Sequence, residues 1–156
     1  VYGKQSIIGG VDYTNVNKTK KIYTENGTKK ISNDIRKHLD KTFDVKRNGT
    51  IKLDGYSKSS GMPFDITVER NGKFIGIEVS FQVTTNSVIE RKGGQAQERQ
   101  KQMHEMGHYI SYVIDGAGNF QRRSAVSTIC NFSDCTVAYS DSEFNVLVNF
   151  IKECLL

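Results

Sequence analysis

The sequence lacks the features that mark membrane, secreted and disulfide-stabilised proteins. Its 156 residues include one proline and three cysteines, and no apolar run approaches the length of a membrane-spanning helix. No signal peptide opens the chain, and the cysteines are odd in number and form no Cys-x-x-Cys pair. We therefore expect reduced thiols, a cytoplasmic location and no association with a membrane.

The composition is otherwise that of one ordinary globular domain spanning residues 1–156. Hydrophobic residues make up 37% and charged residues 25% of the chain, without a repeat, linker, helix-turn-helix or zinc finger. Residues 1–61 are basic, with 13 Lys and Arg against 6 Asp and Glu, whereas residues 62–156 hold 9 against 11. This asymmetry suits a protein that binds a polyanion beside a metal site.

The most informative stretch is residues 64–81, two runs of β-forming residues around Asn71-Gly72. Asn-Gly supports a two-residue type I′ turn, which fixes the register of the hairpin and places Asp65 opposite Glu78. Their Cβ atoms would then lie about 5 Å apart, and like charges directly opposite each other destabilise a sheet. We therefore expect a cation between them, and a divalent metal held by hard oxygen ligands is the simplest choice.

Alternation of side chains along these strands predicts one polar and one apolar face. The polar face carries Asp65, Thr67, Glu69, Phe74, Gly76, Glu78 and Ser80. The apolar face consists of Phe64, Ile66, Val68, Ile75, Ile77, Val79 and Phe81. The structural alternative is an amphipathic edge hairpin whose polar face simply meets water.

The first third of the chain is predicted to contain short strands, one helix and a loop. We expect strands over residues 1–31, and a helix that is capped by Ser32 or Asn33 and runs to about Phe43. Residues 44–63 should form two short strands around Asn48-Gly49 and then a mobile loop beside the hairpin. The lysines of these segments are candidates for phosphate contacts, with a solvated surface as an equal alternative: Lys20, Lys21, Lys29, Lys30 and Lys58.

The remaining residues alternate between helix and strand patterns. A helix is predicted over 87–106, with a capping box at 87–90 and a close neighbour at Gly93-Gly94. A strand over 109–114, a helix over 122–131, a strand over 136–139 and a final helix after a second capping box at 140–143 should follow. This order predicts an α/β fold, a mixed β-sheet flanked by helices.

The carboxylate motif resembles the core of the PD-(D/E)XK nuclease superfamily. The resemblance rests on Pro63-Phe64-Asp65 followed by Glu78-Val79-Ser80, spread over a hairpin that precedes a helix. The downstream order resembles the catalytic domains of type II restriction endonucleases, including type IIS cleavage domains and small cleavage subunits. It consists of Gln82, then residues 91–96, then residues 112–118. The resemblance covers about residues 62–156, with residues 1–61 as a basic N-terminal part.

The resemblance implies Mg²⁺-dependent hydrolysis of phosphodiester bonds in double-stranded DNA. Asp65, Glu78 and the carbonyl of Val79 would bind the metal. The family's lysine position is occupied by Ser80, so its role falls to Ser80 itself or to Gln82, Glu90 or Lys92. Arg91 and Lys92 would contact DNA. Cutting both strands would require a homodimer or a larger recognition or cleavage subunit.

Two other functions are consistent with the sequence. The fold could be a catalytically inactive nucleic-acid-binding module, because serine cannot supply the positive charge of the family lysine. A zinc metallopeptidase is suggested by the HExxH string His104-Glu105-Met106-Gly107-His108, with Glu143 as a distant third ligand. Against zinc, Gly107 should end the helix inside the motif.

Overall fold

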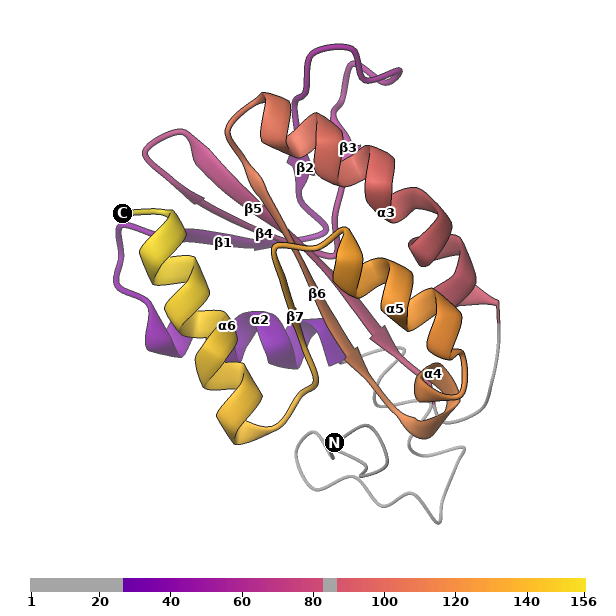
Figure 1. The fold of residues 1–156 in the computed structure, drawn as a ribbon. Helices are drawn as coiled ribbons and strands as arrows, with labels where there is room; N and C mark the ends of the chain where they lie inside the picture. The colour runs from indigo at the N-terminus through magenta and orange to yellow at the C-terminus, as the bar shows by residue number, and fades with distance from the viewer. Residues whose placement is uncertain (1–26, 83–86) are drawn as a thin grey trace.

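The computed structural model describes residues 27–82 and 87–156, which form a five-stranded sheet in the order β1-β4-β5-β6-β7 (Figure 1). β1, β4 and β5 pair antiparallel, whereas β5, β6 and β7 pair parallel. The strands are β1 Asp44–Arg47, β4 Ile66–Arg70, β5 Lys73–Phe81, β6 Tyr109–Asp115 and β7 Cys135–Val137. The predicted mixed sheet is confirmed.

Helices cover both faces of this sheet. α2 (Thr28–His38) and α6 (Asp141–Cys154) pack on one face. α3 (Val88–Glu105) and α5 (Arg123–Asn131) pack on the other, with the short α4 (Ala117–Phe120) at the end of β6 (Figure 1). Within the described residues, none of these helices is both long and apolar enough to cross a membrane.

The central hairpin has the predicted register. Asn71 and Gly72 adopt φ angles of 54° and 80°, as a type I′ turn requires. Arg70 therefore faces Lys73, and the pairing continues to Ile66 opposite Ile77. Asp65 immediately precedes β4, so the same register brings it to Glu78.

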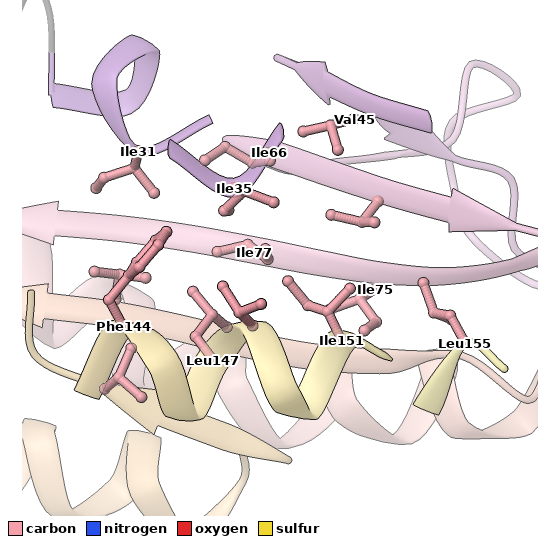
Figure 2. Packing of buried hydrophobic residues seen from close by; sticks show 14 residues of the cluster. Ile31, Ile35, Val45, Ile66, Ile75, Ile77, Phe144, Leu147, Ile151 and Leu155 are labelled. Atoms are coloured by element: carbon pink, nitrogen blue, oxygen red, sulfur yellow. The ribbon is translucent and has the colours of Figure 1, made fainter. Parts of the chain in front are cut away.

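The face covered by α2 and α6 contains an extended apolar core (Figure 2). Alternate residues of β4 and β5 point into it, and Val79 and Phe81 pack against it partly buried. Each helix contributes an apolar stripe at helical spacing to this core: Ile31 and Ile35 from α2, and Phe144, Leu147, Val148 and Ile151 from α6. Full burial of each such side chain stabilises the fold by about 1.5–3 kcal/mol.

The prediction for the other face of the hairpin was wrong for one residue, Phe64. Phe64 lies on the same face as Glu78, because it precedes β4 and its N–H donates to Gly49 O, outside the strand alternation. That face is also not open to water, since α3 buries it. The amphipathic edge hairpin is therefore excluded: β4 and β5 are interior strands covered on both faces.

The segments before the hairpin differ from the prediction in detail. α2 begins at Thr28, so Ile31 is helical rather than extended, and it ends at His38, before Phe43. Ser32 does not cap the helix, because its hydroxyl donates to Lys29 O within it. The two short strands around Asn48-Gly49 are confirmed. They have different partners: β1 pairs with β4, and β2 (Thr50–Ile51) pairs with β3 (Met62–Pro63).

The predicted elements after the hairpin are confirmed, with ends that shift by one or two residues. The capping box at 140–143 is half formed, since Ser140 Oγ accepts from the Glu143 N–H. The capping box predicted at 87–90 is not formed: the Ser87 side chain does not cap the helix, and Glu90 pairs with Arg122 instead. A Cβ on Gly93 would lie 3.3 Å from Ala125 O, whereas one on Gly94 would meet nothing within 4 Å.

Candidate active site

Asp65 and Glu78 share a pocket of about 300 Å³ between the hairpin and α3. Asp65 reaches it from the residue before β4, and Glu78 from the middle of β5. The Val79 N–H donates to Asp65 Oδ2 over 2.8 Å, which ties the two carboxylate-bearing segments together. The pocket is lined by Asn48, Pro63, Phe64, Asp65, Glu78, Arg91, Lys92, Gln95 and Arg99.

Two cations on α3 neutralise this carboxylate pair. Lys92 Nζ lies 3.3 Å from Asp65 Oδ2 and 3.0 Å from Glu78 Oε2, and so bridges the two acids. Arg99 donates through Nη1 to Glu78 Oε1 and through Nη2 to the Pro63 carbonyl. The side chains of Glu78, Lys92 and Arg99 are only 7, 13 and 15% exposed. The cation expected between the acids is thus, in this structure, a lysine ammonium.

Arg99 is held in place by an aromatic ring. Its guanidinium lies over Phe64, 4.3 Å from the ring centroid. The ring in turn lies on Gly76, where an added Cβ would come within 2.5 Å of the ring carbons. The absence of a side chain at Gly76 therefore allows Phe64 to approach the sheet, and Phe64 supports the arginine that binds Glu78.

The two carboxyl groups have pKa values shifted in opposite directions. Burial raises the pKa of Glu78; the Lys92 charge opposes this, while the neighbouring Asp65 raises it further. Burial also acts to raise the pKa of Asp65, but hydrogen bonds with Glu78 and the Val79 N–H, together with Lys92, lower it below its usual range. Asp65 therefore ionises first and Glu78 second, as expected for two acids that share one site.

Tyr112 lies beside Glu78, its register partner on β6. Its hydroxyl is buried and makes no hydrogen bond within the described residues. Burial raises the pKa of Tyr112 to about 12, so the hydroxyl stays protonated near neutral pH.

Among the residues proposed from the sequence, the pocket brings together Asp65, Glu78, Arg91 and Lys92. It does not include three of the candidates for the lysine role. Ser80 is buried beyond the pocket, where its oxygens accept hydrogen bonds from Asn119. Gln82 lies at the end of β5, and its carbonyl accepts from Gly118 N. Glu90 is turned to Arg122, 2.5 Å away.

The remaining DNA-contact candidates are spread over the molecule. Lys29 and Lys30 belong to α2, which packs on the opposite face of the sheet from α3, and Lys30 pairs with Asp34. Lys58 is exposed in the loop between β2 and β3. Lys20 and Lys21 lie outside the described residues.

Sequence reasoning missed Arg99, Gln95 and Asn48 as pocket residues. The first two carry a signal: Gln95 and Arg99 follow Lys92 at i+3 and i+7, so all three share one side of an α-helix. Asn48 has no comparable signal, because it reaches the pocket only through the pairing of β1 with β4.

The structure separates the residues of the HExxH string. α3 ends at Glu105, and Gly107 leaves the helical conformation with φ 75°. His104 binds Asp134, while buried His108 accepts from the Phe74 N–H. Glu143 accepts from the Ala138 N–H. Across residues 27–82 and 87–156, no group of three or more His, Cys, Asp or Glu could hold a metal ion, and the zinc-peptidase arrangement is therefore absent there.

The chain is similar in sequence to type II restriction enzymes. A family model described as the BanI C-terminal domain matches residues 4–155. The type II restriction enzyme HgiCI of Herpetosiphon aurantiacus is 56% identical over 121 residues, which cover 76% of this chain and 35% of that protein. The type II restriction enzyme BanI of Aneurinibacillus aneurinilyticus is 52% identical over 118 residues, 74% of this chain and 33% of that protein. The chain thus spans about a third of the length of these relatives.

One solved structure is similar in outline. It is the small subunit of the heterodimeric restriction endonuclease R.BspD6I, with 17% identity and a TM-score of 0.48 over 90% of this chain and 75% of that chain.

Proposed function

Because the chain belongs to the BanI C-terminal domain family of type II restriction enzymes, we propose that it carries a PD-(D/E)XK-type site for Mg²⁺-dependent hydrolysis of DNA phosphodiester bonds. One observation carries the proposal: Asp65 and Glu78 meet in one pocket with the Lys92 ammonium against both. This arrangement supplies two acids and one cation without a lysine at position 80.

The donor set fits magnesium. Mg²⁺ prefers oxygen ligands and is often bound by one or two carboxylates, with waters and substrate phosphate completing its coordination. Asp65 and Glu78 provide two such carboxylates, and the Val79 carbonyl is a further candidate. When bound, Mg²⁺ would lower the pKa of the attacking water and stabilise charge that develops on the phosphate.

Lys92 would replace the family lysine from a different element. Its ammonium is nearly buried, lies within 3.0–3.3 Å of both acids and lines the pocket, so it can donate to a phosphate oxygen or to the attacking water. Arg99 would act as a positioning residue, since it binds Glu78 and the Pro63 carbonyl together. Ser80, Gln82 and Glu90 face other partners and would not take part.

Double-stranded DNA is the proposed substrate, with Arg91 and Lys92 as the phosphate contacts nearest the acids. We place the catalytic core at residues 62–156. Cutting both strands would need a second copy of the site, from a homodimer or from a larger partner subunit.

An inactive DNA-binding module is the second candidate. It is favoured by Ser80, whose hydroxyl already accepts a hydrogen bond from Asn119 and has no place in the pocket. Such a protein would bind DNA and leave it uncut in Mg²⁺.

Plasmid nicking in Mg²⁺ and in EDTA separates these proposals. We expect wild type and Glu153→Gln, an exposed glutamate of α6, to nick only in Mg²⁺. Glu78→Gln should bind DNA but lose cleavage. Binding without cleavage by wild type would support the inactive module, and undiminished cleavage by Glu78→Gln would refute the assignment of the site.

A further inference from the structure

The ammonium of Lys92 lies where a metal ion shared by the two acids would have to bind. Its Nζ is 3.0 Å from Glu78 Oε2 and 3.3 Å from Asp65 Oδ2. The other oxygen of the Glu78 carboxylate, Oε1, already accepts from Arg99 Nη1. Mg²⁺ binds carboxylate oxygens at about 2.1 Å, so an ion on Oε2 would lie at most about 5 Å from the ammonium. Two cations at that separation in a nearly buried site repel each other strongly.

Of the two cations on α3, Arg99 is fixed and Lys92 can move. Arg99 donates to both Glu78 and the Pro63 carbonyl. Its guanidinium also lies over the Phe64 ring. Within the described residues, the Lys92 ammonium donates only to the two acids. Lysine carries its charge on a flexible four-carbon stem and lacks the rigid planar fork of arginine, so it changes partners more readily.

The backbone at Lys92 is held by the packing of the next residue. A Cβ on Gly93 would lie 3.3 Å from the Ala125 carbonyl oxygen, so α3 and α5 approach each other closely there. The Lys92 side chain also lines the pocket beside the acids. A change of partner by Lys92 therefore requires only a rotation of its side chain within this pocket.

The charge balance of the pocket favours such a change when DNA and a metal ion are both present. With both acids ionised, Asp65 and Glu78 balance Lys92 and Arg99, and the group is neutral. A divalent ion alone adds two positive charges to this nearly buried group, which is costly. A DNA phosphate supplies a negative charge and a new partner for the lysine ammonium.

We propose that Lys92 changes partners when the site is loaded: it bridges Asp65 and Glu78 in the metal-free protein, and it moves to a DNA phosphate oxygen when a metal ion takes the two acids. The inference rests on the proposed nuclease function and describes how that site is controlled. Metal and DNA each favour the state in which Lys92 has left the acids, so they should bind cooperatively. A metal ion without DNA is then bound weakly.

Calorimetric titration of the full chain with Ca²⁺, without DNA, is the first test. Ca²⁺ is the probe because it takes the same oxygen ligands. Lys92→Met should bind Ca²⁺ at least about fivefold more tightly than wild type, the factor that corresponds to an ion pair at the upper end of the exposed range. Lys92→Gln should also bind more tightly than wild type, and it serves if Lys92→Met does not fold. Asp65→Asn should lose this binding, which shows that the titration reports the acid pair.

Arg91→Met is the matched control for charge alone. Arg91 lines the same pocket, is exposed and makes no ion pair within the described residues. Its removal should change the affinity for Ca²⁺ in the absence of DNA by less than about twofold, because water screens an exposed charge.

The second test measures how much DNA raises the affinity for Ca²⁺. A short duplex of mixed sequence should raise it by a larger factor in wild type than in Lys92→Met, with a ratio of about fivefold between the two factors. By linkage, Ca²⁺ must raise the affinity for DNA by the same factor in each protein, so fluorescence anisotropy with labelled DNA checks the calorimetry. A gel after each titration confirms that the DNA stays uncut.

The outcomes separate this inference from the nuclease function. If wild type cleaves DNA in Mg²⁺ but Lys92→Met binds Ca²⁺ no more tightly than Arg91→Met does, Lys92 does not compete for the acids. The inference is then overturned and the nuclease function stands. If wild type binds no Ca²⁺ with or without DNA and cuts nothing in Mg²⁺, the proposed function fails and the inference fails with it.

Discussion

The two faces of the sheet are built from the same strands but bury different chemistry. On the α2–α6 face, the buried residues of β4 and β5 are all aliphatic: Ile66, Val68, Ile75 and Ile77. On the α3 face, the same strands bury Thr67, Glu78 and Ser80 beside a second apolar cluster. On the first face these two strands therefore contribute only apolar packing, while on the second they also hold a charged site.

The energetic difference between the faces follows from burial. Each aliphatic side chain on the α2–α6 face contributes a favourable transfer free energy of about 1.5–3 kcal/mol. Each charge taken out of water on the α3 face costs several kcal/mol, which its partner recovers only when the geometry is good. The buried cluster of Glu78, Lys92 and Arg99 is therefore not expected to add much stability, and buried groups with shifted pKa values are typical of functional sites.

Removing the Lys92 ammonium, which bridges the two acids, should impair the proposed cleavage activity of the α3 face. We expect Lys92→Met to lower the rate of Mg²⁺-dependent cleavage by about 10²–10³-fold, the usual effect of losing one donor to a developing charge. Lys101→Met, on the opposite side of α3, should leave the rate within about twofold of wild type. Single-turnover cleavage of a plasmid measures both, and equal rates for the two variants would contradict the role of Lys92.

Truncation on the α2–α6 face should affect stability alone. Ile151 is fully buried in the apolar core (Figure 2), so Ile151→Ala should lower the free energy of unfolding by about 2–5 kcal/mol. Val146→Ala, 55% exposed on the same helix, should change it by less than about 0.5 kcal/mol. Urea denaturation gives both values. A loss of cleavage per folded molecule in Ile151→Ala would show that the faces are not separable in this way.

Gly76→Ala tests whether packing on the α3 face supports the charged site. The new methyl group would overlap the Phe64 ring, so we expect a loss of about 1–3 kcal/mol in stability and reduced cleavage, because Phe64 supports Arg99. Gly94→Ala is the opposite case: nothing lies within 4 Å, and alanine in a helix should stabilise by about 1 kcal/mol. Thermal denaturation measures both effects. A melting temperature that shifts in the same direction for both variants would refute the proposed packing.

The sequence was sufficient where local rules decide the outcome. The Asn71-Gly72 turn and strand alternation predicted the register that brings Asp65 to Glu78, and both depend only on residues close in the chain. The apolar spacing of 144, 147, 148 and 151 likewise predicted which side of α6 is buried.

The sequence was insufficient where distant segments meet. Phe64 was assigned to the wrong face because its position depends on the Gly49 carbonyl, fifteen residues away. Arg99 was missed because its partner Glu78 lies on another element, and Asn48 because β1 joins the edge of the hairpin. Lys92 was predicted only as one of several candidates for the lysine role, and only the packing of α3 places its ammonium against both acids.

The smallest effect should come from Glu78→Gln, measured as stability against pH in EDTA. The folded-state pKa of Glu78 is raised, chiefly by burial, so its contribution to stability is fully present below the unfolded-state pKa and is lost as pH rises through the folded-state value. Glutamine keeps the shape and an acceptor for Arg99 but cannot ionise. The stability of Glu78→Gln relative to wild type should therefore increase as pH rises through the raised pKa. Glu153→Gln, at an exposed site, should show no such trend. The opposite trend for Glu78→Gln would mean that the attraction of Lys92 and Arg99 exceeds the cost of burying the Glu78 carboxylate. The charged cluster on the α3 face would then stabilise the fold rather than lower its stability.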